Sequence, residues 1–287
     1  MTDIFLPSQS RAEKHGWTTL RVPLKRCLAR SLPEAAFRMS SNSLGTVTIA
    51  SLCVLLPISF ILASIVRPET IGEIAREDGP IENVGAFFFL LSSIMFLILY
   101  FRSAEYPNRF FSLVTQRNVY LLCLAAVCFL AFGEEISWGQ RVFGWGTPEG
   151  WRLQNLQGET NIHNLWFVSR WAGSSLWLQI TDATHLFSAF WFFYGIVIPV
   201  ACLASKRVEG SVTYAGVPIP PLPEGLLLGA NYFLAELFVH FFVVAQDSVV
   251  ALYEVKETNY AIIVASIALG LWSRKGPDET ACRRNPN

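Results

Sequence analysis

The chain has 287 residues, of which 52% are hydrophobic and only 15% are charged. A soluble domain usually carries about 25% charged residues, so this composition indicates a membrane protein. Lys and Arg number 22 and Asp and Glu also number 22, so no net positive charge favours a nucleic acid, and none is expected as a partner. The 22 Phe and 9 Trp exclude a disordered chain, and six Cys in so long a chain do not indicate a disulfide-stapled secreted domain.

Six apolar stretches approach the length of about 20 residues that a helix needs to cross a bilayer. They are residues 45–66, 84–101, 118–137, 183–205, 225–246 and 259–273. The third ends in carboxylates, and the sixth is short unless helical residues precede it. Pro57 and Pro199 lie within spans and should kink them. The predicted fold class is therefore all-α, a polytopic membrane bundle of about six transmembrane helices.

Charge sets the expected orientation, because loops rich in Lys and Arg stay on the cytoplasmic side. Sixteen of the 22 basic residues lie in the two tails and in the loops after the second and fourth spans. This distribution predicts a cell-membrane protein with both termini in the cytoplasm. The expected organisation is a basic tail over 1–44, a bundle over 45–273 and a second tail over 274–287, with the first span acting as a signal anchor.

Polar residues gather where the third span meets the outer interface. Glu134 and Glu135 end this span, and if the helix continues, Glu134, Trp138 and Arg141 share one face. Arg141 could then neutralise one carboxylate, and Gln140 adds an amide nearby.

The connection between the third and fourth spans is rich in Trp and amides. Six of the nine Trp fall within 138–178, which predicts an interfacial segment that covers the bundle. Candidate substrate-binding residues in this region and at the start of the fourth span are Gln140, Gln157, Glu159, Asn161, Asn164, Asp182 and His185.

The fifth span carries an ionisable pair inside an apolar segment. Glu236 is expected near the bilayer midplane, and His240, four residues later, projects from the same face. Such residues usually face a bundle interior or a wet cavity, so the pair could share a proton or a metal ion. Asn231 could extend this polar stripe.

Two resemblances rest on these motifs. GEEISWGQR (133–141) and LQGETNIHN (156–164), preceded by EDGPIE (77–82), resemble the signature of a family of bacterial integral membrane proteins to which no activity is assigned. Glu134 and Glu135 followed by Arg141 are also similar to the paired-glutamate motif of the CAAX-processing and bacteriocin-immunity intramembrane proteases. In that family three residues separate the second glutamate from the arginine, whereas five do so here, and its FxxxH pattern is absent.

These residues favour an intramembrane enzyme acting at the outer leaflet on a lipid or lipid-linked substrate. Glu134 or Glu135 would be the general base, and Arg141 would hold an anionic headgroup. Glu236 and the histidines would transfer protons or bind a divalent metal whose identity the spacing does not specify. The candidate catalytic residues are Glu134, Glu135, Arg141, His163, Glu236 and His240.

Other interpretations remain open at this point. The protein could be a proton-coupled transporter in which Glu236 and His240 form a relay. It could also be a scaffold in which polar groups only join helices. Glu134, Glu135 and Arg141 could form a self-neutralising helix end, and Asp182 could be a helix cap.

Overall fold

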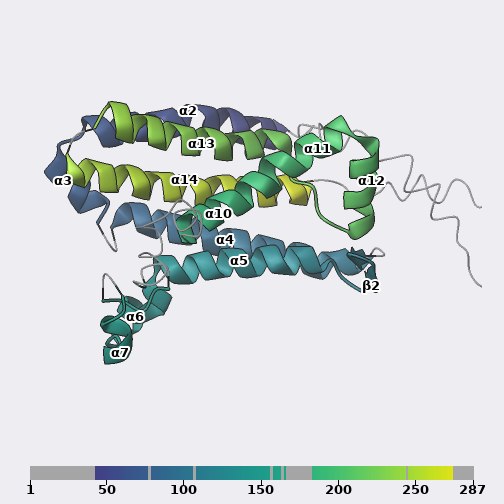
Figure 1. Cartoon of the computed structure of the whole chain (residues 1–287), viewed down its shortest axis with the longest axis horizontal. Helices are drawn as coiled ribbons and strands as arrows, with labels where there is room; N and C mark the ends of the chain where they lie inside the picture. Colours follow the sequence, from purple (N-terminus) through teal and green to yellow (C-terminus); the bar gives the residue numbers. More distant parts are fainter. Residues whose placement is uncertain are drawn as a thin grey trace, which may run out of the picture.

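In the computed structural model, the described residues are 43–76, 79–105, 108–155, 158–162, 165, 183–243 and 245–273. Most of them are helical (Figure 1). In chain order the first half contains α2 (Ser43–Ile65), α3 (Pro68–Ile74), α4 (Pro80–Arg102), η1 (Ser103–Glu105), β1 (Asn108–Phe110), β2 (Leu113–Thr115), α5 (Val119–Glu135), η2 (Ser137–Gly139), α6 (Gln140–Phe143) and α7 (Glu149–Arg152). The second half contains α10 (Ala183–Phe192), the π-helix η4 (Phe193–Val197), α11 (Ile198–Ala204), α12 (Lys206–Ala215), α13 (Leu222–Phe241) and α14 (Gln246–Ser273).

Among the described residues, four helical segments are long and apolar enough to cross a membrane. They are Gly45–Ile65, Pro80–Arg102, His185–Ala204 and Leu222–Phe241. The prediction of a helical class is therefore confirmed, and the four segments fit the predicted integral membrane protein. The two remaining predicted spans correspond to α5, which has 17 residues, and to α14, which has 28 and carries several charges.

The long helices lie roughly side by side, so the bundle has two ends (Figure 1). One end holds the C-terminal ends of α2, α5 and α13 and the N-terminal ends of α4, α10 and α14, together with α3, α6 and α7. The opposite end carries the β1–β2 hairpin and α12. Most polar candidates from the sequence therefore belong to the first end.

Helix α14 is the central element, since it packs against α2, α3, α4 and α13. Its side chains Leu252, Ile263, Val264 and Ile267 are fully buried. The helix begins thirteen residues before the predicted sixth span. The prediction began later because charged residues in the first half of the helix lower the local hydropathy below that of a typical span. At 1.5 Å per residue it is about 42 Å long.

Polar side chains join neighbouring helices inside the bundle. The Ser93 hydroxyl donates to the Ala125 carbonyl, and Asn259 donates to the Ser59 hydroxyl. Asn231 is fully buried, and its amide donates to the Lys256 carbonyl at 2.9 Å. Its side chain thus ties α13 to α14. Such bonds stabilise helix pairs in membranes, where an unpaired polar group has no water to bind.

Helix α13 and the fourth predicted span come into close contact beside the proline at position 199. Pro199 has no N–H to donate to the carbonyl of Gly195, four residues earlier, and the helix widens there into η4. A Cβ atom on Gly225 would lie only 1.7 Å from the Gly195 carbonyl oxygen. Glycine at position 225 therefore lets the two backbones touch.

Helix α5 does not continue through the signature motif. It ends at Glu135, and Ser137 and Trp138 have φ angles of 46° and 54°. The chain turns sharply here before α6 begins at Gln140. The continuous helix on which Glu134, Trp138 and Arg141 would share a face is therefore not formed.

Candidate functional site

The segment after α5 folds around the Glu134 carboxylate. The Trp138 indole N–H donates to one Glu134 oxygen at 2.6 Å, and the Ile162 backbone N–H donates to the other at 2.7 Å. The left-handed turn at Trp138 brings its indole back onto α5, where its ring lies against Gly133. Glu134 thus connects the end of α5 to the segment 28 residues farther along the chain.

Further side chains complete this connection. The Ser137 hydroxyl donates to Glu159, and the backbone N–H of Thr160 donates to the Gln140 side-chain oxygen at 3.0 Å. Asn155 and Asn161, both nearly buried, are joined because the Asn155 amide donates to the Asn161 backbone and side-chain oxygens.

We refer to this set as the signature network, and its members are Glu134, Ser137, Trp138, Gln140, Asn155, Glu159, Thr160 and Asn161. Three predicted substrate-binding residues, Gln140, Glu159 and Asn161, belong to it. Their polar groups bond to one another or to the backbone. In the structure these three residues therefore stabilise the loop that follows α5.

Glu135 points to the other side of α5, into the bundle. Its carboxylate lies near Gly85 of α4, where a Cβ atom would be 3.8 Å from the Glu135 oxygen. Burial removes this carboxyl group from water, and four other acidic side chains act on it more weakly, in decreasing order Glu257, Glu254, Glu82 and Glu134. Adjacent glutamates in the sequence thus face different environments, one hydrogen-bonded in the network and one among carboxylates.

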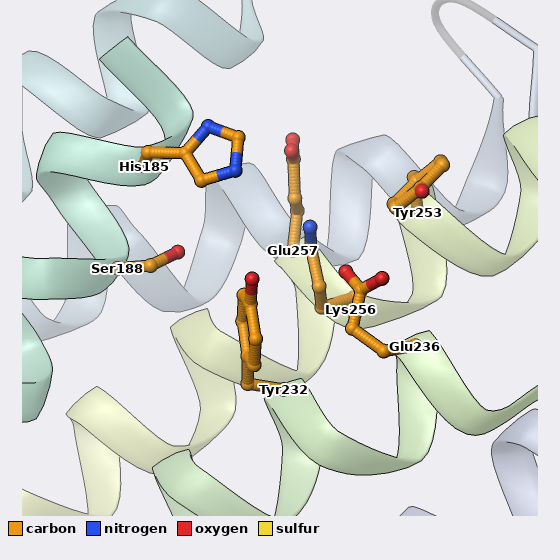
Figure 2. A pocket seen from close by; sticks show the side chains of 7 residues that line it. All are labelled: His185, Ser188, Tyr232, Glu236, Tyr253, Lys256 and Glu257. Carbon is orange, nitrogen blue, oxygen red and sulfur yellow. The ribbon is translucent and has the colours of Figure 1, made fainter. Parts of the chain in front are cut away.

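A pocket of about 260 Å³ opens between α10, α13 and α14 (Figure 2). We call it the lysine pocket, and its lining residues are His185, Ser188, Tyr232, Glu236, Tyr253, Lys256 and Glu257. The structure brings together two predicted site residues here, His185 from the start of α10 and Glu236 from α13. The other five are additional residues that the sequence did not single out.

Lys256 is the most unusual member of the pocket, because it is charged and only 4% exposed. Its ammonium group lies 4.6 Å from the centre of the Tyr253 ring and 5.9 Å from that of Tyr232. Within the described chain no carboxylate forms an ion pair with it at 4.0 Å or less. The faces of the tyrosine rings thus provide a cation–π contact, but they are not conventional hydrogen-bond acceptors for the ammonium N–H groups.

Glu236 lines the lysine pocket and also contacts the more exposed His240. Its carboxylate is 3.6 Å from His240 Nδ1, and this ring nitrogen is also 2.9 Å from the Glu236 carbonyl oxygen. His240 is 65% exposed, so it lies on the outer surface of α13. Helix α13 ends at Phe241, so Glu236 is about 8 Å from the helix end and not in its middle, as the predicted span implied.

Several predicted residues fall outside the described residues. Gln157, His163, Asn164 and Asp182 belong to this group, and so do residues 166–178 of the Trp-rich stretch and nearly all of both tails. Arg141 lies in α6, and its side chain is likewise outside the described part. In the described ranges no group of three or more His, Cys, Asp and Glu side chains is arranged to hold a metal ion.

The missed pocket residues had one signal in the sequence. Tyr253, Lys256 and Glu257 are spaced three and four residues apart, which places them on one face of a helix. The predicted sixth span begins at residue 259 and leaves open whether helical residues precede it, so these three residues were not predicted as a site.

No protein-family model matches the chain, and comparisons with curated proteins and with solved structures find no match. The resemblance to a bacterial membrane-protein family therefore stays a prediction that rests on the quoted motifs.

Proposed function

We propose that this chain is a six-helix protein of the cell membrane, with α5 and α14 as the two further spans. Its tails would be cytoplasmic, and the lysine pocket would belong to the outer half of the bundle. The support for α14 is its length and central packing, since a helix buried on nearly all sides needs little contact with lipid. The orientation is supported by the positions of the basic residues.

We further propose that the pocket binds the polar group of a membrane lipid or lipid-linked molecule and catalyses its hydrolysis. The observation that carries this proposal is the buried Lys256 ammonium, which faces a pocket containing two carboxylates. A buried charge without a counter-ion is costly, and a site for an anionic group provides the compensating interaction.

The pocket has the groups that acid–base chemistry requires. Glu257 or Glu236 would accept a proton from the attacking water, and Lys256 would stabilise the negative charge that develops on the substrate. His185 would return a proton to the leaving alcohol. Water thus adds across an ester or phosphoester bond, and the products are an acid and an alcohol.

The test uses purified protein in nanodiscs made from a defined lipid mixture, with products measured by mass spectrometry. We expect turnover by the natural protein and its loss in Lys256→Met and Glu257→Gln. Glu73→Gln is the matched control, because Glu73 is 74% exposed on α3 and pairs only with Arg76. Absence of any product in the natural protein, or full turnover in Lys256→Met, would contradict the proposal.

A proton-coupled transporter is the second candidate, and one observation favours it. The Glu135 carboxyl group interacts electrostatically with several acidic side chains, and the strongest of these interactions is with Glu257 of the pocket, so protons could pass between the helices. Proteoliposomes that show substrate flux driven by a pH gradient, and lose it in Glu135→Gln, would support this function over hydrolysis.

A further inference from the structure

The charged groups of the lysine pocket are close to one another but are not paired. Lys256 and Glu257 adjoin in the sequence, and Glu236 faces them from α13 (Figure 2). None of the carboxylates of the described chain lies within 4.0 Å of the Lys256 ammonium. Opposite charges that share a pocket are expected to pair directly, so their separation leaves both signs available to a ligand.

The lysine side of the pocket suits an anionic group. Figure 2 shows the Lys256 ammonium and the hydroxyl groups of Ser188 and Tyr232 directed into the same space. The Lys256 ammonium and the Tyr232 hydroxyl offer N–H and O–H donors of the kind that bind phosphate or carboxylate oxygens, whereas the Ser188 side chain is hydrogen-bonded to Tyr260.

The carboxylate side of the pocket suits a cation with N–H groups. Glu236 and Glu257 are both acceptors, and they outnumber the one lysine, so the pocket has a surplus of negative charge. A purely anionic ligand would be repelled by these carboxylates. A primary ammonium would donate to them, whereas a quaternary ammonium has no N–H to donate.

We infer that the lysine pocket selects a zwitterionic group that joins a phosphate to a primary amine, as in the ethanolamine headgroup. This inference rests on the proposed function and names the class of its substrate. The volume of about 260 Å³ lies below the roughly 300–1,000 Å³ of pockets that take whole drug-sized ligands, which suits such a headgroup alone. The acyl chains would remain in the membrane.

The first experiment measures binding without requiring catalysis. Full-length protein in nanodiscs with equal amounts of phosphatidylethanolamine, phosphatidylcholine and phosphatidylglycerol is transferred to detergent, and the retained lipids are counted by native mass spectrometry. We expect phosphatidylethanolamine to be retained about tenfold over the other two, as one or two charge-assisted hydrogen bonds imply. Equal retention of all three, or preference for the anionic lipid, would overturn the inference.

Variants assign the selectivity to the two sides of the pocket. Lys256→Met should reduce retention of phosphatidylethanolamine about tenfold. Glu236→Gln with Glu257→Gln should remove the preference over phosphatidylglycerol while keeping the fold, since both changes preserve side-chain shape. The Glu73→Gln control should bind like the natural protein. A double variant that keeps the preference would contradict the inference.

A second arm identifies the source of the headgroup. Soluble phosphoethanolamine at millimolar concentration should displace the retained lipid only if the pocket takes the free molecule, and displacement would reassign the ligand from lipid to solute. Retention of phosphatidylethanolamine without turnover would support the inference and contradict the proposed hydrolysis. Turnover of phosphatidylglycerol would support hydrolysis and contradict the inference.

Discussion

The signature network and the lysine pocket lie toward the same end of the bundle but treat their polar groups in opposite ways. In the network, the Glu134 carboxylate receives an indole and a backbone N–H, and Asn155 binds Asn161 twice. In the pocket, the ammonium of the nearly buried Lys256 lies over two tyrosine rings and forms no ion pair with a carboxylate of the described residues. Polar groups bonded to each other fix a loop, whereas buried charges held apart reduce stability and are retained when a ligand needs them.

This comparison predicts the largest loss of stability in the network. Asn155→Ala would remove the two hydrogen bonds that the Asn155 amide donates to the Asn161 oxygens and the one that its side-chain oxygen accepts from the Glu159 N–H. We expect the free energy of unfolding to fall by about 2–3 kcal/mol. Thermal unfolding in detergent measures this change, and Gln154→Ala, at an exposed neighbouring position, should have little effect. An unchanged midpoint in Asn155→Ala would show that the network does not hold the loop.

Removing the charge of Lys256 from the lysine pocket should change the stability in the opposite direction. Lys256→Met removes a buried charge without a counter-ion and keeps an unbranched side chain among the tyrosines. We expect the free energy of unfolding to rise by about 1–2 kcal/mol while ligand retention is lost. Lys206→Met is the control, because Lys206 is 71% exposed and pairs with Glu209. Destabilisation of Lys256→Met would show that its ammonium has a structural partner.

The adjacent glutamates provide a sharper test of the same contrast. Glu134→Gln weakens two charge-assisted hydrogen bonds, so stability should fall by about 1–2 kcal/mol. Glu135→Gln relieves repulsion from Glu257, Glu254 and Glu82, so stability should stay level or rise. The measurement is the free energy of unfolding of the two variants, determined in parallel. A change of the same sign in both would contradict the difference between the two glutamate environments.

The smallest effect is expected at the edge of the pocket. His240→Ala removes a long, exposed contact with Glu236, and such contacts contribute about 0.5 kcal/mol or less. Turnover and lipid retention should persist, because His240 does not line the pocket. Loss of turnover with the fold intact would restore His240 as a catalytic residue.

The sequence predicted the helical class well, because long apolar segments fold as helices in a membrane whatever their neighbours. It located the Glu236–His240 contact from their spacing. It did not reveal the turn at Ser137 and Trp138, since neither residue type normally adopts positive φ, and only tertiary contacts of the indole fix it. Lys256 was not predicted as a site residue because the charged residues in the first half of α14 lower its hydropathy below that of a typical span, so the predicted span begins after Lys256.

The most direct test of the central claim is a high-resolution structure of the protein in nanodiscs containing phosphatidylethanolamine. We predict headgroup density in the lysine pocket, with phosphate oxygens within hydrogen-bonding distance of Lys256 and the amine facing Glu236 or Glu257. A direct Lys256–carboxylate ion pair in a pocket without lipid, or headgroup density within the signature network, would contradict the account.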